Sequence, residues 1–446
     1  MKSINRRSFL KSTLAAGVAP LFVPSRILGD QAPSRTLNLA SVGLAHQGSR
    51  VTRTFSDNDR VRIVALCDVD LDQSGVQGAL NRDPDAARYH DFRVMLAEMD
   101  EDIDAVAIST PDHSHFPIAI LAMSMGKHVF VEKPLANTFH EAELLMQAAE
   151  KYGVVTQMGN QGHSGANFHQ AKAFAEAGLF DGVNRIVACH NRGRRWHPWG
   201  DVEGYPEEEP MPEGLQWDLW FAAAEPQPYS ERLHPRNWRS WYRFGMGTLG
   251  DWGPHILDTT HRFLNLGLPT EIELVHVERH NPYIFPLETT LRFAFPARGH
   301  QPPVELLWHD GTENRPDDEF IGAAGRVLYG GAHTFAGNSH GSAIRVVPES
   351  KRQEVQRDLP RFERGSNHFD NFVLAALGEE EARSPFDVAA PLNQFFNLGV
   401  IAQELGLVGV TLKFDPATKQ FTNNDEANRL LSYPSPREGW EEFYKL

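Results

Sequence analysis

The segment VGLAHQG, at positions 42–48, follows a short apolar run, LNLASV. Gly43 and Gly48 have the spacing of the first and third glycines in G-x-G-x-x-G, whereas Ala45 stands in place of the second. Gly43 would form a tight turn, and Gly48 would let the helix that begins near Gln47 pack closely on the strand. The segment therefore predicts a β-strand, a tight turn and a helix, which together begin a sheet of parallel strands.

A second apolar strand, VRIVALCDVD, contains Asp68, which follows Gly48 at about the 20 residues expected in a dinucleotide-binding β-α-β unit. In such a unit a pyrophosphate lies at the helix N-terminus, and the acid accepts hydrogen bonds from a ribose. An acid there repels a 2′-phosphate, so NAD is favoured over NADP. Ala45 adds a methyl group near the pyrophosphate but leaves the amide donors in place. An ordinary β-α turn without a ligand is the alternative.

Strands and helices alternate over the first third of the chain. IDAVAIST, KHVFVEKP and VVTQMGN have the composition of buried strands. A helix is predicted from Phe92 to Met99, with Asp91 as its N-cap. The helix in TFHEAELLMQAAEKYG has a capping box formed by Thr138 and Glu141, and Gly153 suits its C-terminal end. This alternation predicts parallel β-α-β units, with ligands at the carboxyl ends of the strands.

The second half of the chain has a different pattern. After a strand, RIVACHNRG, comes a segment rich in proline and aromatic residues, which holds six of the nine tryptophans. IELVHVER, TTLRFAF and VELLWHDG alternate in polarity and predict an open, mostly antiparallel sheet, while HFDNFVLAAL and NQFFNLGVIAQELG predict helices. We predict an α/β chain with an N-terminal Rossmann domain, a doubly wound parallel sheet, at 36–160. A C-terminal α/β domain follows at 161–430, with a Trp-rich insertion at 191–245 and a tail at 431–446.

The N-terminus carries an export pattern. NRRSFLK, with Arg6 next to Arg7, precedes TLAAGVAPLFV, an apolar run too short to span a bilayer. Paired arginines before such a run resemble a twin-arginine signal. We predict that residues 1–30 are this signal and that the protein is periplasmic or in the cell envelope. A basic, frayed N-terminus is the alternative.

Composition restricts the partners. The chain has 43 basic and 58 acidic residues and a net charge of −15, whereas nucleic acids and anionic membrane surfaces need a positive footprint. We therefore expect no nucleic acid, and no membrane partner for the mature domains. Cys67 and Cys189 fall in predicted strands and are interpreted as buried thiols rather than a disulfide or a metal pair.

Two further motifs carry acid–base groups. VEKP puts Glu132 and Lys133 at the carboxyl end of a predicted strand, where a lysine can donate to a substrate hydroxyl. GTLGDWGPHILD puts Asp251 and His255 on one side of a helix, and His255 could take a hydroxyl proton while hydride leaves the same carbon. The alternative for Lys133 is a surface ion pair with Glu132. The alternative for Asp251 is a helix cap, and for His255 a hydrogen-bonded histidine in the core. Asp251, His255 and His261 match no strong ligand motif, so no metal is predicted.

The Trp-rich insertion has two interpretations of equal weight. In one, its aromatic and basic side chains stack on sugar rings and bind hydroxyls. In the other, the insertion is an arm whose aromatic side chains pack on the rest of the protein or on a neighbouring subunit. The side chains in question are Trp196, Trp199, Trp238, Trp241, Arg192, Arg194 and Arg195.

Together these motifs resemble the Gfo/Idh/MocA oxidoreductases, named for glucose–fructose oxidoreductase and inositol dehydrogenase. The markers are the glycine loop, ALCDVD, STPDHSH, VEKPLA, GNQ and GDWGPHILD, and the resemblance runs from Asn38 to the C-terminal helices. The Trp-rich segment is similar to an exported branch of the family. The family implies a Rossmann domain, a C-terminal α/β domain whose open sheet forms subunit contacts, and a substrate cleft between them. Ala45, and Ser109 where asparagine is common, depart from the family pattern.

The resemblance also implies roles for residues at matching positions. Lys133 would be the catalytic or substrate-positioning lysine, His255 the acid–base group and Asp251 its substrate-binding companion. The predicted cofactor-binding residues are Gly43, Ala45, His46, Gln47, Gly48, Asp68, Thr110, Pro111, His115, Glu132, Lys133 and Gln161. The predicted substrate-binding residues are Asn160, Arg194, Trp196, Trp238, Asp251 and His255.

Three functions are compatible with these motifs. The first is an exported NAD-dependent oxidoreductase for a secondary alcohol of a sugar, cyclitol or glycoside, with tightly held NAD because free NAD is not expected outside the cytoplasm. The second is redox-neutral cleavage or epimerisation by oxidation, elimination and reduction, although related NAD-dependent glycosidases tend to lack the E-K-P lysine. The third is a non-catalytic sugar-binding protein, which the three retained polar groups disfavour. We expect a small carbohydrate or polyol partner and a homo-oligomer formed through the C-terminal sheet.

Overall fold

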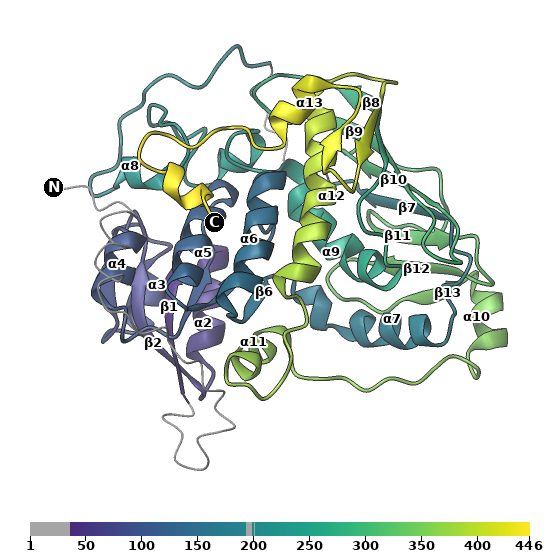
Figure 1. Cartoon of the computed structure of the whole chain (residues 1–446), viewed down its shortest axis with the longest axis horizontal. Coiled ribbons are helices and arrows are strands. Elements are labelled where there is room, and N and C mark those ends of the chain that lie inside the picture. Colours follow the sequence, from purple (N-terminus) through teal and green to yellow (C-terminus); the bar gives the residue numbers. More distant parts are fainter. Residues whose placement is uncertain (1–35, 193–198, 200) are drawn as a thin grey trace.

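The computed structural model describes residues 36–192, 199 and 201–446. The predicted signal at 1–30 lies outside these residues, as do Arg194, Arg195 and Trp196. The chain forms two sheet-containing layers, and the helices α6 (Phe139–Tyr152) and α12 (Phe386–Leu405) pack against each other between them (Figure 1). A continuous apolar core joins the two layers through these helices.

The N-terminal sheet has six parallel strands in the order β3-β2-β1-β4-β5-β6. Along the chain they are β1 (Leu37–Val42), β2 (Val61–Cys67), β3 (Ala87–Tyr89), β4 (Ala105–Ile108), β5 (His128–Val131) and β6 (Thr156–Met158). The helices besides α6 are α2 (Gln47–Ser56), α3 (Gln77–Arg82), α4 (Phe92–Glu98) and α5 (Asp112–Ser124). The predicted doubly wound sheet is confirmed. In this strand order a ligand binds outside the carboxyl ends of β1 and β4, where the order reverses.

Local signals fix several of these helix ends. The Asp91 side chain accepts the backbone N–H of Arg93 at the start of α4, as predicted. Thr138 and Glu141 form the predicted capping box of α6, and Gly153 ends that helix in the left-handed conformation. Helix α5 was not predicted, because all but its last residue are buried and it therefore lacks the polar stripe of an amphipathic helix.

The C-terminal sheet has nine strands in the order β13-β12-β11-β7-β10-β9-β8-β14-β15. They are β7 (Arg185–His190), β8 (Glu271–Glu278), β9 (Glu288–Phe295), β10 (Val304–Asp310), β11 (Ala324–Tyr329), β12 (Thr334–Asn338), β13 (Arg345–Val347), β14 (Thr411–Asp415) and β15 (Gln420–Phe421). Neighbouring strands are antiparallel except β7 and β10, which are parallel. The predicted open, mostly antiparallel sheet is confirmed. Strands β11 to β15 were not predicted, because most of them are short.

Helices α9 (Gly247–Phe263) and α12 pack on this sheet. The remaining helices are α7 (Ala166–Glu176), α8 (Trp217–Trp220), α10 (Glu349–Val355), α11 (His368–Ala376) and α13 (Asp425–Leu430), with the 3-10 turns η3 (Gln161–Ser164), η4 (Asn237–Ser240) and η5 (Glu441–Tyr444). None of the described helices has the length and apolar character needed to cross a bilayer. Cys67 and Cys189 are buried free thiols, as predicted.

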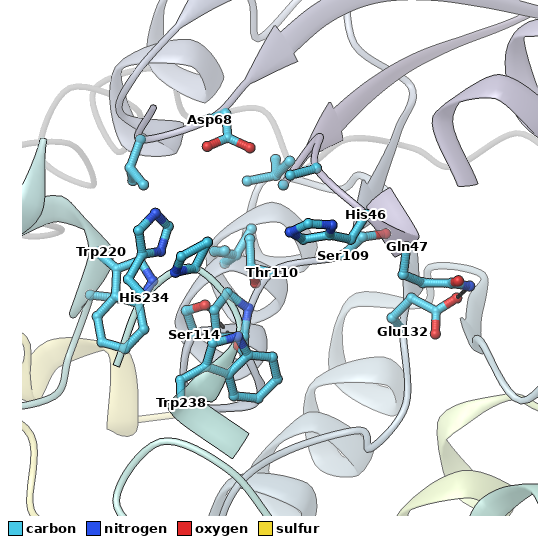
Figure 2. Close-up of a pocket in the computed structure, with 18 of the residues that line it drawn as sticks. His46, Gln47, Asp68, Ser109, Thr110, Ser114, Glu132, Trp220, His234 and Trp238 are labelled. Carbon is cyan, nitrogen blue, oxygen red and sulfur yellow. Dashed lines mark hydrogen bonds between the residues drawn. The ribbon is translucent and has the colours of Figure 1, made fainter. Parts of the chain in front are cut away.

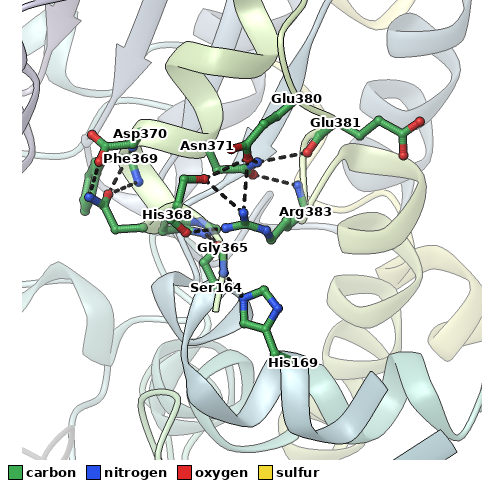
Figure 3. A network of polar contacts seen from close by, with 12 residues as sticks. Ser164, His169, Gly365, His368, Phe369, Asp370, Asn371, Glu380, Glu381 and Arg383 are labelled. Carbon is green, nitrogen blue, oxygen red and sulfur yellow. Dashed lines mark hydrogen bonds and ion pairs between the residues drawn. The ribbon is translucent and has the colours of Figure 1, made fainter. Parts of the chain in front are cut away.

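A polar network fixes the segment that joins α11 to α12 (Figure 3). The Arg383 guanidinium donates to Ser366 Oγ at 2.9 Å and lies 3.1 Å from Glu380 Oε2. The His368 ring lies 2.8 Å from both Ser164 Oγ and the carbonyl oxygen of Met158. The network therefore holds the end of β6 and the turn η3, which begins at a predicted site residue.

Part of the Trp-rich insertion, residues 214–245, crosses onto the N-terminal domain, and we call it the arm. The backbone N–H of Gln216 donates to the carbonyl oxygen of Val69, just after β2. Trp220, Leu233 and Trp241 belong to an apolar core within the arm. For these side chains the structure supports the interpretation that the aromatic residues pack as an arm.

The C-terminal tail packs on the arm and on the N-terminal domain. The backbone N–H of Arg437 donates to the carbonyl oxygen of Ala223 in the arm at 2.9 Å. Trp440 is buried beneath the Arg93 guanidinium, and the Tyr444 hydroxyl donates to Glu141 at 2.7 Å. The tail thus ties the arm to helices α4 and α6.

Candidate active site

A cleft of about 620 Å³ lies at the carboxyl edge of the parallel sheet, and residues of the arm line part of it. The predicted site residues that line it are Gly43, Ala45, His46, Gln47, Asp68, Thr110, Pro111, Glu132, Lys133, Gln161, Trp238, Asp251 and His255. Figure 2 shows Trp220 and His234, from the arm, on one side of this cleft, with Gln47 and Glu132 on the other. The structure therefore brings most of the predicted residues together.

The glycine loop needs glycine at two positions. Gly43 has φ +81°, and a Cβ atom there would lie 2.8 Å from the carbonyl carbon of Ser109. A Cβ atom at Gly48 would lie 2.0 Å from the Gly43 oxygen, so the helix could not pack as closely. Ala45 is half-buried and avoids positive φ, which His46 adopts instead at +51°. Alanine is therefore tolerated in this loop without backbone strain.

The start of α2 is suited to an anion. It has no side-chain cap, and its first turn contains no acidic residue. Its amide dipoles therefore favour a negative group, such as a pyrophosphate, at this end of the helix. Asp68 lies beside the same loop and accepts the backbone N–H groups of Leu44 at 2.7 Å and Asp70 at 3.0 Å. Burial raises the Asp68 pKa to about 6, although these hydrogen bonds act to lower it. The carboxylate is therefore ionised at neutral pH and can accept hydrogen bonds from ribose hydroxyls.

Four charged side chains meet at the other end of the cleft. Lys133, just after β5, places its Nζ 2.6 Å from Oδ1 of Asp251 on α9. The Arg239 guanidinium lies 3.8 Å from the same oxygen and 2.7 Å from Asp112 at the start of α5. The Lys133 and Asp251 side chains are only 12% and 5% exposed. Lys133 is therefore a largely enclosed cleft residue that pairs with Asp251, and the surface ion pair considered for it is wrong.

His255 lies one turn beyond Asp251 on α9. Its ring stacks on that of His340, with centroids 4.0 Å apart, and its carbonyl oxygen accepts the backbone N–H of His340 at 3.0 Å. Its buried Nδ1 has no hydrogen-bond partner among the described residues. Burial, then the charge on Lys133, holds the pKa of His255 well below its ordinary value of 6.5. The ring is therefore neutral at physiological pH and can accept a proton.

We expect His255 to stay neutral until the pH falls well below 6.5, because burial and nearby positive charge oppose its protonation. Any activity that needs the neutral imidazole should therefore lose rate only below that pH. A histidine-selective NMR titration measures the pKa, and the His255→Asn variant identifies the signal by its loss. Titration of this signal at 6.5 or above would contradict the expectation.

Unsatisfied polar atoms test whether the cleft fits NAD. Thr110 Oγ1, Glu132 Oε2 and Gln161 Oε1 are buried and have no hydrogen-bond partner among the described residues. A buried polar group without a partner costs about 1–3 kcal/mol, so such a cluster is expected where a polar ligand binds. The hydroxyl and amide groups of NAD would satisfy these atoms, and the open helix N-terminus suits its pyrophosphate. The residues present therefore fit this cofactor.

Three predicted site residues do not line the cleft. Gly48 is buried beneath the glycine loop. The His115 ring nitrogens face the carbonyl oxygens of Pro134 at 2.7 Å and Thr110 at 2.9 Å, so this side chain holds two cleft loops together rather than contacting a ligand. Asn160 is buried against Asp258, with Nδ2 3.5 Å from a carboxylate oxygen. Arg194 and Trp196 are outside the described residues.

The structure also adds cleft residues that the sequence reasoning missed. They are Trp220, His234, Arg236, Arg239 and His340. Asp112, which is buried beside the cleft and binds Arg239, was also missed. Basic and aromatic residues alternate in HPRNWRSWYRF, which was a usable signal for the arm residues. His340 lies in a loop after β12 and had no signal in the sequence.

Comparisons with known proteins agree with this geometry. Residues 37–160 match the family model of the GFO_IDH_MocA oxidoreductases, described as an NAD-binding Rossmann fold, and residues 164–296 match the model of the C-terminal alpha/beta domain of the same family. A WlbA dehydrogenase from Bordetella pertussis, solved with NADH and UDP-GlcNAcA, is similar in fold, with a TM-score of 0.57 and 14% identity. The match covers 85% of this chain and 99% of that one.

Two curated relatives match part of the chain. A glycosyl hydrolase family 109 protein of Shewanella pealeana is 31% identical over 215 residues, which are 43% of this chain and 47% of that protein. A 2,7-anhydro-N-acetylneuraminate hydratase of Mediterraneibacter gnavus is 26% identical over 36% of this chain and 41% of its own length. The chain thus matches less than half the length of these relatives. Both family models, the strand order and the cleft lead to one conclusion: the chain belongs to the Gfo/Idh/MocA oxidoreductase family and contains its NAD-binding Rossmann domain.

Proposed function

We propose that the protein is an NAD-dependent oxidoreductase that oxidises a secondary alcohol of a sugar, cyclitol or glycoside and holds NAD tightly. The observation that carries this proposal is the position of Lys133, Asp251 and His255 in the same cleft as the glycine loop. A donor, a carboxylate and a neutral imidazole are the groups needed to bind an alcohol and remove its proton.

The chemistry divides among these residues. Lys133 Nζ, oriented by Asp251, donates a hydrogen bond to the substrate oxygen, and Arg239 keeps Asp251 in place. His255 accepts the hydroxyl proton at a ring nitrogen as the C–O bond gains double-bond character. NAD, when bound, supplies the hydride acceptor. Arm residues line one side of the cleft and pack on an apolar core of their own.

A redox-neutral reaction is the second candidate. It is favoured by the names of the curated relatives, a glycosyl hydrolase and a hydratase, because neither name describes net oxidation. In such a reaction the alcohol is oxidised, the acidified neighbouring C–H loses a proton, a leaving group departs, and the product is reduced again. Neutral His255 could serve as a base in either scheme.

One experiment separates the two candidates. NAD-loaded protein is incubated with free aldoses, UDP-GlcNAcA, 2,7-anhydro-N-acetylneuraminate and nitrophenyl glycosides, while nicotinamide absorbance and product formation are recorded together. Dehydrogenation gives reduced cofactor in proportion to oxidised sugar, whereas the redox-neutral reaction gives cleaved or rearranged product without lasting reduction. We expect reduced cofactor. Protein that neither contains nor binds NAD would refute both schemes.

Two expectations from the sequence stay predictions. We propose that residues 1–30 direct export, which fractionation of cells that make the full chain would test through the share of protein found outside the cytoplasm. We also propose that copies associate through the C-terminal nine-stranded sheet. Light scattering that gives the mass of one chain would contradict this second expectation.

A further inference from the structure

One short segment of the arm follows the length of the cleft. We call residues 234–239 the strap, and all of them except Asn237 line the cleft. At one end Arg239 binds Asp112 at 2.7 Å, beside the proposed catalytic groups. At the other end the His234 ring lies within 6.1 Å of the Trp220 ring, measured between centroids. The strap thus reaches from Arg239, beside Asp251, to His234, which lies next to Trp220 on one side of the cleft (Figure 2).

In the middle of the strap, Arg236 lies over the glycine loop. Its Nε and one terminal nitrogen are each 3.3 Å from a ring nitrogen of His46. The pKa of His46 is lowered, by burial first and then by the Arg236 charge, so the imidazole does not neutralise the guanidinium. Within 36–192, 199 and 201–446, no carboxylate forms an ion pair with Arg236. A guanidinium beside the open N-terminus of α2 is placed to bind an anion.

At the His234 end of the strap, the arm supplies polar atoms that lack partners among the described residues. Both ring nitrogens of His234 and Nε1 of Trp220 are buried without a hydrogen-bond partner in the described part of the chain. The two side chains line the cleft, and their residues are only 9% and 4% exposed. Burial lowers the His234 pKa to about 4, so the neutral ring offers one donor and one acceptor. These atoms are suited to the hydroxyls and ring nitrogens of a nucleoside.

The arm is held in place from several directions. Buried His113 faces the carbonyl oxygens of Trp220 at 2.9 Å and Phe244 at 3.4 Å. Arg437 of the tail donates from Nε to the carbonyl oxygen of Ala222 at 2.8 Å. Together with the apolar core of the arm, these contacts hold the arm against the N-terminal domain and the tail, and the strap forms one wall of the cleft.

We propose that the strap forms the second half of the NAD site and retains the cofactor between turnovers. Arg236 binds the pyrophosphate from the side opposite α2, and His234 with Trp220 binds the adenosine end opposite Asp68. The Rossmann half alone would allow NAD to exchange freely, whereas the closed site keeps it as a resident group. This inference rests on the proposed function, which makes NAD the cofactor.

The test compares the release of NAD from three forms of the full chain. Radiolabelled NAD is loaded, excess unlabelled NAD is added, and the label that remains on the protein is followed over time. Arg236→Gln should release NAD about 10-fold to 100-fold faster, because it loses a charge-assisted hydrogen bond to phosphate. Arg232→Gln is the matched control, since it removes the same charge from an exposed arm residue that lies outside the cleft. Its release rate should equal that of the unaltered protein.

Salt separates a charge contact from a structural effect. NAD release from the unaltered protein should become faster at high ionic strength, and this dependence should shrink in Arg236→Gln. His234→Phe, which keeps an aromatic ring but loses both nitrogens, should also speed release. Equal release from Arg236→Gln and the unaltered protein would overturn the strap inference and leave the proposed function intact. Failure of the unaltered protein to bind NAD would instead refute the proposed function.

Discussion

Lys133→Met should slow the reduction of bound NAD by about 10²–10⁴-fold, the range typical of a positioned proton-transfer or hydrogen-bonding group. Lys133 Nζ lies 2.6 Å from Asp251 and borders the cleft, so methionine keeps the chain length but removes the donor and its charge. Asp251 would still have Arg239 at 3.8 Å, which limits the structural damage. The loss should therefore fall on turnover rather than on folding.

The measurement is single-turnover formation of reduced nicotinamide, with whichever sugar of the panel gives a signal. NAD content after purification and the circular dichroism spectrum serve as checks that the variant is loaded and folded. Lys172→Met is a matched control, because Lys172 is 57% exposed and pairs only loosely with Glu176. A loaded Lys133→Met protein that reduces NAD within a few-fold of the unaltered rate would remove Lys133 from the proposed chemistry.

Local chemistry explains why the nucleotide half of the molecule could be predicted from the sequence. Several signals determine the structure of only a few neighbouring residues. They are the glycine loop at Gly43 and Gly48, the capping box that begins at Thr138, and Gly153, which ends the same helix. The helix and strand periods between them follow from burial on one face. Asp68 could be placed because a fixed number of residues separates it from the glycine loop in a β-α-β unit.

The electrostatic partners of the site depend on contacts that have no local signal. Lys133 and Asp251 are 118 residues apart, and Asp112 and Arg239 are 127 residues apart. Their pairing follows from how α5, α9 and the arm pack, which no spacing rule describes. His340 reaches His255 only because the loop after β12 lies against η3, where Gly341 approaches Gly162 closely. The sequence pattern could name the candidate catalytic groups but not the charged side chains that pair with them.

The arm shows a second limit of the same kind. The sequence favoured neither a sugar-stacking nor a packing role for its tryptophans, because aromatic side chains serve both purposes. The structure divides them, since Trp241 is fully buried in the arm core while Trp238 lines the cleft. The hydrogen bond from Gln216 to Val69 joins the arm to the N-terminal domain, and the one from Arg437 to Ala223 joins the tail to the arm. Both are backbone–backbone bonds, which leave no pattern in the residue types.

Arg239→Met should lower the free energy of unfolding by about 3–5 kcal/mol, the cost of removing one partner from a buried ion pair. Arg239 contacts both oxygens of Asp112, at 2.7 and 2.8 Å, and lies 3.8 Å from Asp251. The Asp112 side chain has no exposed surface, so the loss of the guanidinium would leave a buried carboxylate without its nearest charge partner. Burial already raises the pKa of Asp112, and the positive charge of Arg239 opposes this rise more than any other group does.

The pH dependence identifies the cause. Without Arg239 the pKa of Asp112 would rise further, so the folded variant would bind protons more readily than the unfolded chain. The stability deficit should therefore be largest at neutral pH and should shrink as the pH falls and the carboxyl group becomes neutral. Urea unfolding at several pH values measures this, with Arg352→Met as the control, because its pair with Glu349 is exposed to solvent and contributes little to stability. A deficit as small as the control's, or one that grows toward acid pH, would show that Arg239 does not neutralise Asp112.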